Sequence, residues 1–374
     1  MDDVDDNRTL PRVFVNSGQP ITVSLPILIC DDSLLARRQI ARALPDEWDV
    51  TISYAANGAQ AIAAIEHGKA HLMFLDLNMP EMTGYDVLKI IRQRDLPCLV
   101  LVVSGDIQPE ARRRVKQLGA LAFLRKPVTA DQIREILQRY GLLASYVREE
   151  GAHIAATSLP APSFMDALRE VVNIAMGTAG SQLGRLLSTF IQLPVPQLHH
   201  CRYEHLPHLL QVSTGELQVP AQVDGRAAPV IMASPDNQLS AVSHGFKGNG
   251  ITGEGVVLMR SRDIGRLDAL MSQDLPDSNA RTRILTDLSE LLLGACLKGL
   301  ADQLDVEFHH SYPVLLGHEK CCMELLRCQG SSQTVLAIEI RYGLLSPDID
   351  CYLLLLITED SLDALKSRAD LLTD

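Results

Sequence analysis

The sequence has little of what zinc modules, secreted proteins and membrane proteins need. Its eight cysteines include no CxxC pair, which argues against both a zinc module and a disulfide framework. No apolar run approaches the roughly 18 residues of a membrane-spanning helix. The first residues, Met1–Asp6, are acidic and lack the basic region and apolar core of a signal peptide. We therefore expect a cytoplasmic protein without membrane insertion.

Positive charge is also in short supply. The 374-residue chain has a formal net charge of −12 and a pI of about 5.4. Non-specific nucleic-acid binding depends on phosphate neutralisation by Lys and Arg, so we expect no nucleic-acid partner. At about 150 residues per domain, the length predicts two or three domains, and the composition is that of a globular protein.

The chain divides into four segments of different composition. Residues 1–24 are polar, acidic and without periodicity, which indicates a flexible tail. Residues 25–144 alternate five short apolar runs with five amphipathic stretches, which predicts an α/β domain with a parallel five-stranded sheet covered by helices on both faces. Residues 145–162 contain a stretch rich in Ala, Pro and Ser and are typical of a linker. Residues 163–374 form the last segment.

This last segment follows a different pattern. Two long helical patterns, at 164–190 and 282–304, are each followed by strand-like runs. These runs lie at 208–212, 218–223, 228–232, 335–340 and 352–357. Two successive helix-plus-strands halves indicate an internal duplication, although their sequence identity is weak. We expect a second α/β domain built from two related halves.

The ends of the predicted parallel strands carry a set of polar residues. They are Asp31 and Asp32 after the first strand, Asp76 at the end of the third, Ser104 at the end of the fourth and Lys126 beyond the fifth. Open parallel sheets bind ligands in the crevice at these carboxyl ends. Three carboxylates in one crevice need a hard cation such as Mg²⁺, beside which one of them can attack phosphorus. Taken singly, each Asp could instead be a solvated loop residue or a helix N-cap.

Together with their neighbours, these residues resemble the receiver domain of two-component response regulators of the CheY type. The matching motifs are Cys30–Ser33, Leu75–Pro80, Gly84, Ser104–Gly105 and Phe123–Pro127. The resemblance implies a flavodoxin-like fold in which Asp76 is the phosphoacceptor and a histidine kinase is the phosphodonor. It also implies that Asp31 and Asp32, with Asp76 and the Asn78 carbonyl, bind Mg²⁺.

The same resemblance implies that Ser104 and Lys126 hold the phosphoryl group, and that Ser104 and Phe123 form the switch that responds to it. A transcription regulator would need a basic recognition helix after the receiver, and the strongly acidic remainder offers none. Basic residues gather instead on the predicted fourth helix of the receiver, at Arg112–Arg114 and Lys116. We expect this helix to pack against the acidic C-terminal segment.

A polar stripe runs along the first long helix of the C-terminal segment. Asp166, Glu170 and Asn173 are spaced i, i+4, i+7 and lie within roughly 60° of one another on a helix. The stripe continues through Gly177, Gly180 and Gly184. Each glycine costs a helix about 1 kcal/mol relative to alanine, which indicates that something approaches this backbone closely. An ordinary amphipathic helix with a solvated polar face would give the same stripe of acid and amide.

This spacing, followed by Pro196, resembles the signature of the CheC/CheX/FliY phosphatases, which remove phosphate from receiver domains. The resemblance implies that Asn173 orients a water molecule, that Glu170 contacts the receiver's lysine, and that Asp166 and Pro196 are supporting residues. The chain would then be a chemotaxis-type phospho-aspartate phosphatase, a hydrolase. Its substrate would be a separate, phosphorylated CheY-like regulator, and phosphorylation of its own Asp76 would regulate it.

The second half repeats the signature imperfectly. Thr286 and Glu290 keep the spacing, but Leu293 stands where the amide belongs and cannot orient water, so we expect this second site to be inactive. The alternative to an enzyme is a non-catalytic receiver-docking module or a flagellar-switch-type adaptor that grips receivers through Glu170.

Two further patterns carry no function in this interpretation. Gly248–Gly253 matches GxGxxG, but a strand pattern follows it where dinucleotide binding requires a helix. The segment 199–208 is rich in His but has no spacing of a known zinc module.

Overall fold

Five short apolar runs form the parallel sheet of an N-terminal domain in the computed structural model. They are β1 (Leu25–Cys30), β2 (Val50–Ala55), β3 (Leu72–Leu75), β4 (Leu99–Ser104) and β5 (Ala122–Arg125). Their order, β5–β4–β3–β1–β2, is the doubly wound, flavodoxin-like arrangement. The central strand β3 is buried along its whole length because helices cover both faces of the sheet. Those helices are α1 (Leu34–Arg42), α2 (Gly58–Glu66), α3 (Gly84–Gln93), α4 (Pro109–Gln117) and α5 (Ala130–Arg139).

The structure describes residues 24–143, 155–156, 159–207, 238–270, 280–326, 333–345 and 348–372. Nearly all of the predicted tail, most of the predicted linker and the predicted strands at 208–212, 218–223 and 228–232 lie outside these residues. In the described part of the chain, no helix is long and apolar enough to cross a membrane.

A short strand that the sequence did not predict extends the N-terminal sheet. β6 (Ala155–Ala156) pairs in parallel with β2, with Ala156 opposite Ile52. These two residues belong to the segment expected to be a linker. Through this pairing the chain returns to the edge of the first sheet before it enters the second domain.

The C-terminal domain is built on one antiparallel sheet. Its strands are β7 (Ile191–Gln192), β8 (Gln197–Arg202), β9 (Leu239–Gly248), β10 (Ile251–Arg260), β11 (His309–His310), β12 (Val314–Lys320), β13 (Thr334–Leu345) and β14 (Asp348–Thr358). Asn249 and Gly250 join β9 to β10 in a tight hairpin, and both have positive φ angles, 45° and 81°. The GxGxxG match therefore lies on a hairpin and opens no helix.

The two halves of this domain have related architectures. The first contains α6 (Phe164–Leu186) and α8 (Ser261–Leu270), and the second contains α9 (Ala280–Leu304), the short α10 (Cys322–Leu325) and α11 (Leu362–Asp370). Each half runs from a long helix through two short strands to a long hairpin and a closing helix. The hairpins meet through β10 and β14, and the short strands of each half pair with the hairpin of the other half.

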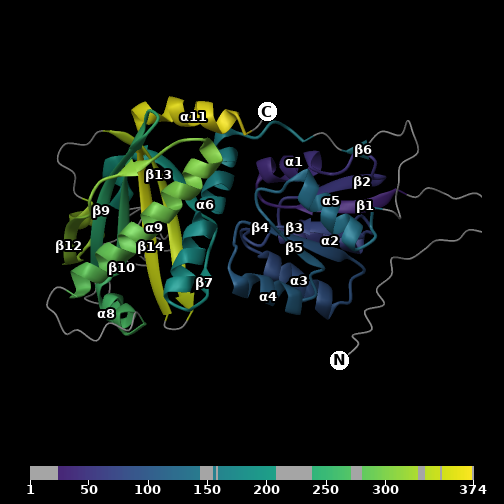
Figure 1. Cartoon of the computed structure of the whole chain (residues 1–374), viewed down its shortest axis with the longest axis horizontal. Coiled ribbons are helices and arrows are strands. Elements are labelled where there is room, and N and C mark those ends of the chain that lie inside the picture. The colour runs from purple at the N-terminus through teal and green to yellow at the C-terminus, as the bar shows by residue number, and fades with distance from the viewer. Residues whose placement is uncertain are drawn as a thin grey trace, which may run out of the picture.

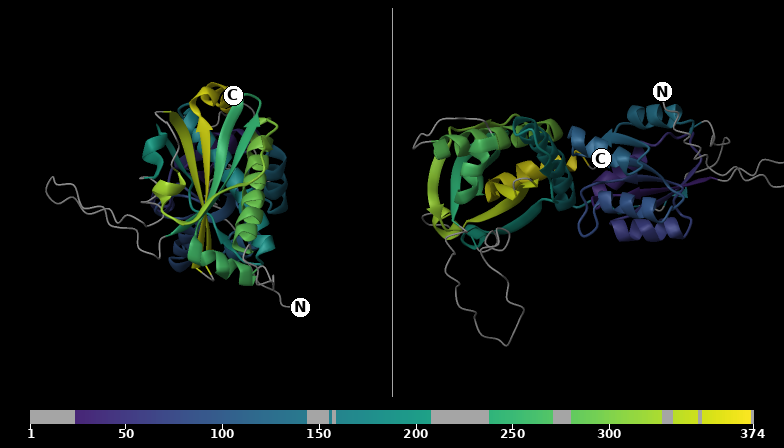
Figure 2. Two further views of the ribbon diagram at one scale, coloured as in Figure 1. Left: turned by 90° about the vertical axis from the view of Figure 1, so that its left-hand side faces the viewer. Right: turned by 90° about the horizontal axis from the view of Figure 1, so that it is seen from below.

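The main core of the domain lies between the sheet and the two long helices. α6 and α9 pack side by side on one face of the sheet (Figure 2), and their apolar residues form one buried cluster with residues such as Val257, Ile338 and Leu353. A smaller cluster under α10 covers part of the opposite face. α6 also borders the N-terminal domain, so that one helix lies between the two domains (Figure 1).

Candidate functional site

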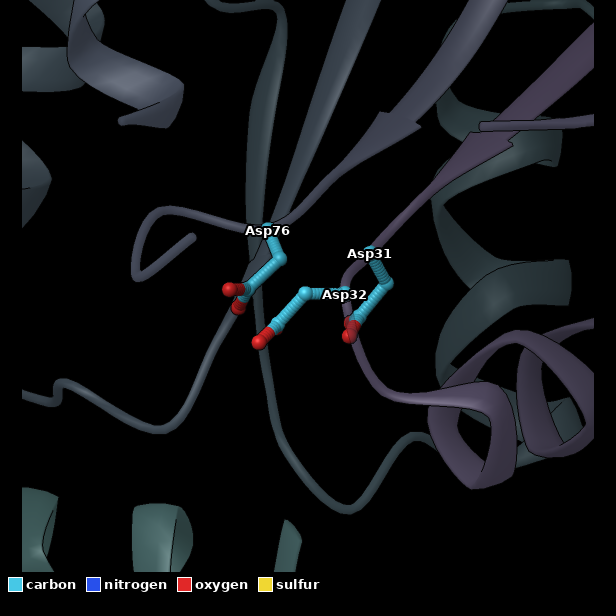
Figure 3. Close-up of side chains that lie close together, drawn as sticks. All are labelled: Asp31, Asp32 and Asp76. Atoms are coloured by element: carbon cyan, nitrogen blue, oxygen red, sulfur yellow. The ribbon is translucent and has the colours of Figure 1, made fainter. Parts of the chain in front are cut away.

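The carboxyl ends of β1 and β3 bring three aspartates together (Figure 3). Asp31, Asp32 and Asp76 each offer a carboxylate oxygen within 4.8 Å of the others, and no other such metal-binding group occurs among the described residues. Burial, with the nearby Asp76 carboxylate, raises the pKa of Asp32 to about 6. A divalent cation would relieve this crowding of like charges, so the residues fit Mg²⁺.

Lys126, just beyond β5, supplies positive charge to this pocket. Its Nζ lies 2.7 Å from Asp31 Oδ2, 3.1 Å from Asp76 Oδ1 and 3.1 Å from Glu170 Oε1. Burial alone would lower the pKa of Lys126, but the three carboxylates raise it well above its ordinary value. The ammonium therefore stays charged, although its side chain is only 3% exposed.

Three further residues of the predicted receiver site lie on or just after β3, β4 and β5. The Ser104 hydroxyl, at the end of β4, accepts a hydrogen bond of 3.1 Å from the Asp106 amide. The backbone amide of Asn78 donates a hydrogen bond of 2.8 Å to Asp76 Oδ2. Phe123 is half-buried on β5, with the guanidinium carbon of Arg112 5.2 Å from its ring centroid.

Glu170 reaches this pocket from α6, in the other domain. α6 begins with a capping box: the Asp166 backbone amide donates to the Ser163 hydroxyl, and the Ser163 backbone amide donates to Asp166 Oδ2, each over 3.2 Å. Asp166 therefore lies in the first turn and stabilises the start of the helix. Glu170 follows one turn later and is 3% exposed. Pro196 is buried in the segment between β7 and β8.

Asn173 lies on the same face of α6, three residues beyond Glu170. It is 5% exposed, and its side-chain Oδ1 has no hydrogen-bond partner within the described residues. Its backbone carbonyl lies beside Gly105, the residue after Ser104. The polar stripe of α6 is thus covered by the N-terminal domain of the same chain and does not face solvent at these positions.

Comparisons with known proteins identify the N-terminal domain. The family model described as response regulator receiver domain matches residues 27–138. The chemotaxis protein CheY of Bacillus subtilis is 33% identical over 113 residues, which make up 30% of this chain and 94% of that protein. The chain belongs to the response regulator receiver family. It is a two-component signalling protein, and its receiver domain carries the Asp31, Asp32 and Asp76 cluster.

Other matches extend past the receiver domain. The protein-glutamate methylesterase/protein-glutamine glutaminase 3 of Geobacter sulfurreducens is 34% identical over 185 residues, or 41% of this chain and 50% of that protein. The chain spans about half the length of several curated relatives that it matches. The crystal structure of FliY from Thermotoga maritima aligns with 57% of this chain and 98% of its own, at 13% identity and a TM-score of 0.38.

The receiver domain and α6 are in direct backbone contact. A Cβ atom added to Gly177 would lie 2.1 Å from the carbonyl oxygen of Gly105, so only glycine allows this approach. At Gly184 the added atom would lie 3.0 Å from Gln108 Oε1. At Gly180 it would meet Leu193 of the C-terminal domain itself. The glycine stripe therefore marks a close approach, as expected, and the receiver provides it at Gly177.

Gln108 is the inter-domain residue that sequence reasoning missed. Its Nε2 donates to the Ile191 carbonyl over 2.8 Å, and the Ile191 amide donates to its Oε1 over 2.9 Å. Gln108 is 2% exposed, so this two-bond pairing is fully buried between the β4–α4 loop and β7. Gln108 precedes α4 without capping it through its side chain, and this poor N-cap residue is the one local sign of another role.

We expected the basic fourth helix to pack against the acidic C-terminal segment, but among the described residues no basic side chain of α4 forms an ion pair with that domain. The guanidinium of Arg114 lies 4.2 Å from the centroid of the Tyr85 ring, and Arg113 forms an ion pair with Glu110 on the same helix. Among the described residues, the receiver domain and the acidic domain are joined by the ion pair between Lys126 and Glu170.

Proposed function

We propose that residues 163–374 form a CheC-like phospho-aspartate phosphatase, and that Glu170 and Asn173 carry its reaction on a phosphorylated, CheY-like receiver. The observation that supports this most is the ion pair between Glu170 and the receiver lysine, Lys126. Asn173 lies one turn further along the same helix face. A helix that presents a carboxylate to a receiver's lysine and an amide beside it has the groups that such a hydrolysis needs.

In the proposed reaction a water molecule attacks the phosphorus atom in line with its bond to the aspartate oxygen. The new bond joins the water oxygen to phosphorus, the bond to the aspartate breaks, and both water protons leave with inorganic phosphate. Asn173 Oδ1 is buried and has no hydrogen-bond partner among the described residues, so it is available to accept a hydrogen from this water. Phosphoryl transfer depends mainly on such positioning, with little covalent help from the protein.

For the receiver domain we propose Asp76 as the phosphoacceptor and a histidine kinase as the phosphodonor. Asp31, Asp32, Asp76 and the Asn78 carbonyl would hold Mg²⁺, which supplies positive charge to the phosphoryl oxygens. Acetyl phosphate with Mg²⁺ should label the wild type and leave Asp76→Asn unlabelled, and EDTA should prevent labelling. Labelling of Asp76→Asn at the wild-type level would rule out this assignment.

Two groups near the phosphoacceptor complete the proposed receiver site. Ser104 and Lys126 would bind the phosphoryl oxygens, since the hydroxyl and the charged ammonium are both buried at strand ends beside Asp76. Ser104 and Phe123 would form the switch that changes on phosphorylation.

The phosphatase activity can be tested on a free, phosphorylated CheY-type protein supplied at about millimolar concentration, so that it competes with the attached receiver. The chain would carry Asp76→Asn, so that its own receiver cannot be phosphorylated, and phosphate release would be followed. Adding Asn173→Ala should slow release by about 100- to 1,000-fold, the usual effect of losing one positioned hydrogen bond in such a site. Glu170→Ala should weaken both binding and release. Glu290→Ala is the matched control, since this exposed glutamate of α9 should not affect release.

The second candidate is a non-catalytic docking module or switch adaptor. The ion pair between Glu170 and Lys126 supports it equally well, because such a contact can bind a receiver without hydrolysing its phosphoryl group. If the chain with Asn173 and the Asn173→Ala chain release phosphate equally slowly and both still bind the phosphorylated receiver, the docking module is the correct interpretation.

A further inference from the structure

We infer that this phosphatase site acts first on its own chain, so that Glu170 and Asn173 remove the phosphoryl group from Asp76 of the same molecule. The inference rests on the proposed function and specifies its substrate. It differs from the expectation drawn from the sequence, in which the substrate was a separate receiver and Asp76 had only a regulatory role.

The receiver that faces α6 is the one encoded in the same chain. Lys126 Nζ lies 3.1 Å from both Asp76 Oδ1 and Glu170 Oε1, so a single ammonium joins the phosphoacceptor to the phosphatase helix. Asp76 is 1% exposed, and Glu170 and Asn173 are 3% and 5% exposed. In this arrangement the predicted substrate residue and the predicted catalytic residues already share one buried site.

Three contacts around the site fix the orientation of the receiver on α6. The Gly105 backbone lies directly on Gly177, with no room for a side chain between them. Gln108 forms its two hydrogen bonds with Ile191. On a third side, Leu35 of α1 forms a buried apolar cluster with Ala167 of α6 and Ala369 of α11.

These contacts are of different kinds and come from different elements of the receiver domain. Together they determine both the position and the rotation of the receiver, which a lone ion pair could not do. Hydrolysis depends on how well the attacking water and the phosphorus atom are aligned, so a fixed docking geometry favours the reaction within one molecule. Asp32, at the edge of the pocket, keeps part of its surface in solvent, which gives water a route to the site.

The reaction consumes one water molecule and needs no other reactant. The water oxygen bonds to phosphorus, the bond between phosphorus and the Asp76 oxygen breaks, and the Asp76 carboxylate is restored. The chain would therefore limit the lifetime of its own phosphorylated state.

The test measures loss of label from Asp76 in the full-length chain. The protein is labelled with radioactive acetyl phosphate and Mg²⁺, the donor is removed, and the remaining label is followed with time. For the wild type we expect a first-order rate constant that does not change over a 100-fold range of protein concentration. Asn173→Ala should lower it by about 100- to 1,000-fold. Asn173→Asp keeps nearly the same side-chain size, but label loss should also be slow because its carboxylate would repel the phosphoryl group. The control variant Glu290→Ala should lose label at the wild-type rate.

A mixing experiment separates reaction within one chain from reaction between chains. Labelled Asn173→Ala protein is mixed with an equal amount of unlabelled Asp76→Asn protein, which keeps both Glu170 and Asn173 but cannot hold a phosphoryl group. We expect no acceleration of label loss. Acceleration to the wild-type rate, or a wild-type rate constant that rises with concentration, would overturn the inference and assign the reaction to pairs of chains.

The two proposals can fail separately. Asn173→Ala could slow phosphate release from a free CheY-type protein but leave label loss from Asp76 unchanged. The docked receiver would then only block access to the site, and the inference that the chain dephosphorylates itself would fail while the proposed function would stand. If Asn173→Ala changes neither reaction, the proposed phosphatase function itself is wrong.

Discussion

The two long helices of the C-terminal domain occupy corresponding places in its two halves, yet they face different surroundings. α6 and α9 lie side by side on one face of the sheet. Glu170 of α6 is 3% exposed because the receiver domain covers it, whereas Glu290 of α9 is exposed to solvent. Of the two related helices, α6 is the one whose glutamate contacts the receiver domain.

The residues three positions further on differ even more. Asn173 lies against the receiver domain, while Leu293 is fully buried, and its Cδ1 would lie 2.5 Å from a Cβ atom added to Gly255 of β10. Leu293 therefore packs between α9 and the sheet. The second half lacks the proposed hydrolysis site for two reasons. It has no amide at position 293, and the side chain at that position points into the core. The proposed reaction is therefore confined to the half that contains α6, whereas the corresponding position of α9 contributes to the hydrophobic core.

Alanine at these two positions should separate chemistry from stability. Leu293→Ala should lower the free energy of unfolding by about 2–5 kcal/mol, as truncations of buried leucines do, without changing label loss per folded molecule. Asn173→Ala should do the reverse: it should raise the hydrolysis barrier by about 2.7–4 kcal/mol and change the free energy of unfolding only slightly. Urea unfolding and label-loss rates measure the two effects. A rate defect in folded Leu293→Ala would remove the distinction between the helices.

Glycine-to-alanine changes test the same contrast at the helix surfaces. In Gly177→Ala the new methyl group would meet the Gly105 carbonyl, and we expect domain docking to weaken by about 1–3 kcal/mol. In Gly294→Ala of α9 the nearest atom, His310 Nε2, lies 3.9 Å away, so we expect a gain of about 0.4–1 kcal/mol in unfolding free energy. Small-angle scattering should show an expanded Gly177→Ala chain and an unchanged Gly294→Ala chain. Equal scattering from both variants would argue against tight docking.

Asp106, in the loop between β4 and α4, should make the free energy of unfolding depend on pH. Burial raises the pKa of Asp106 to about 6, so its folded form binds a proton more readily than the unfolded chain does. The free energy of unfolding therefore falls as the pH rises from about 4 to about 6, because folding Asp106 then requires burying its charge. Above pH 6 the destabilisation stays constant. Asp106→Asn should add about 1–2 kcal/mol to the unfolding free energy at pH 7.5 and nothing near pH 3.5. A gain that is equal at both pH values would contradict this origin.

The sequence predicted the parts of the site that follow from local periodicity. Asp31, Asp32 and Asp76 could be placed together because parallel strands end at one edge of a sheet. Glu170 and Asn173 could be placed on one face because an α-helix repeats every 3.6 residues. Both rules use only the spacing within one element and its order in the chain.

Contacts between distant segments could not be predicted in this way. Gln108 and Ile191 are separated by 83 positions, and neither has a periodic signal that points to the other. The exchange of short strands between the two halves and the pairing of β6 with β2 also depend on tertiary packing. For the same reason, the resemblance of the α6 stripe to the CheC/CheX/FliY signature implied contact with a receiver but could not show that the receiver belongs to the same chain.

Strand β6 has a consequence for competition with other receivers. It holds Ala156 to the receiver's own sheet, and α6 begins at Phe164, so only residues 157–163 connect the two, with a reach of at most about 25 Å. Short tethers of this kind correspond to effective concentrations on the order of millimolar. A free receiver present at about 10 μM would have to bind α6 roughly 100-fold more tightly than the attached one to occupy it equally. Glu170 and Asn173 are therefore accessible to foreign receivers mainly when the chain's own receiver has undocked.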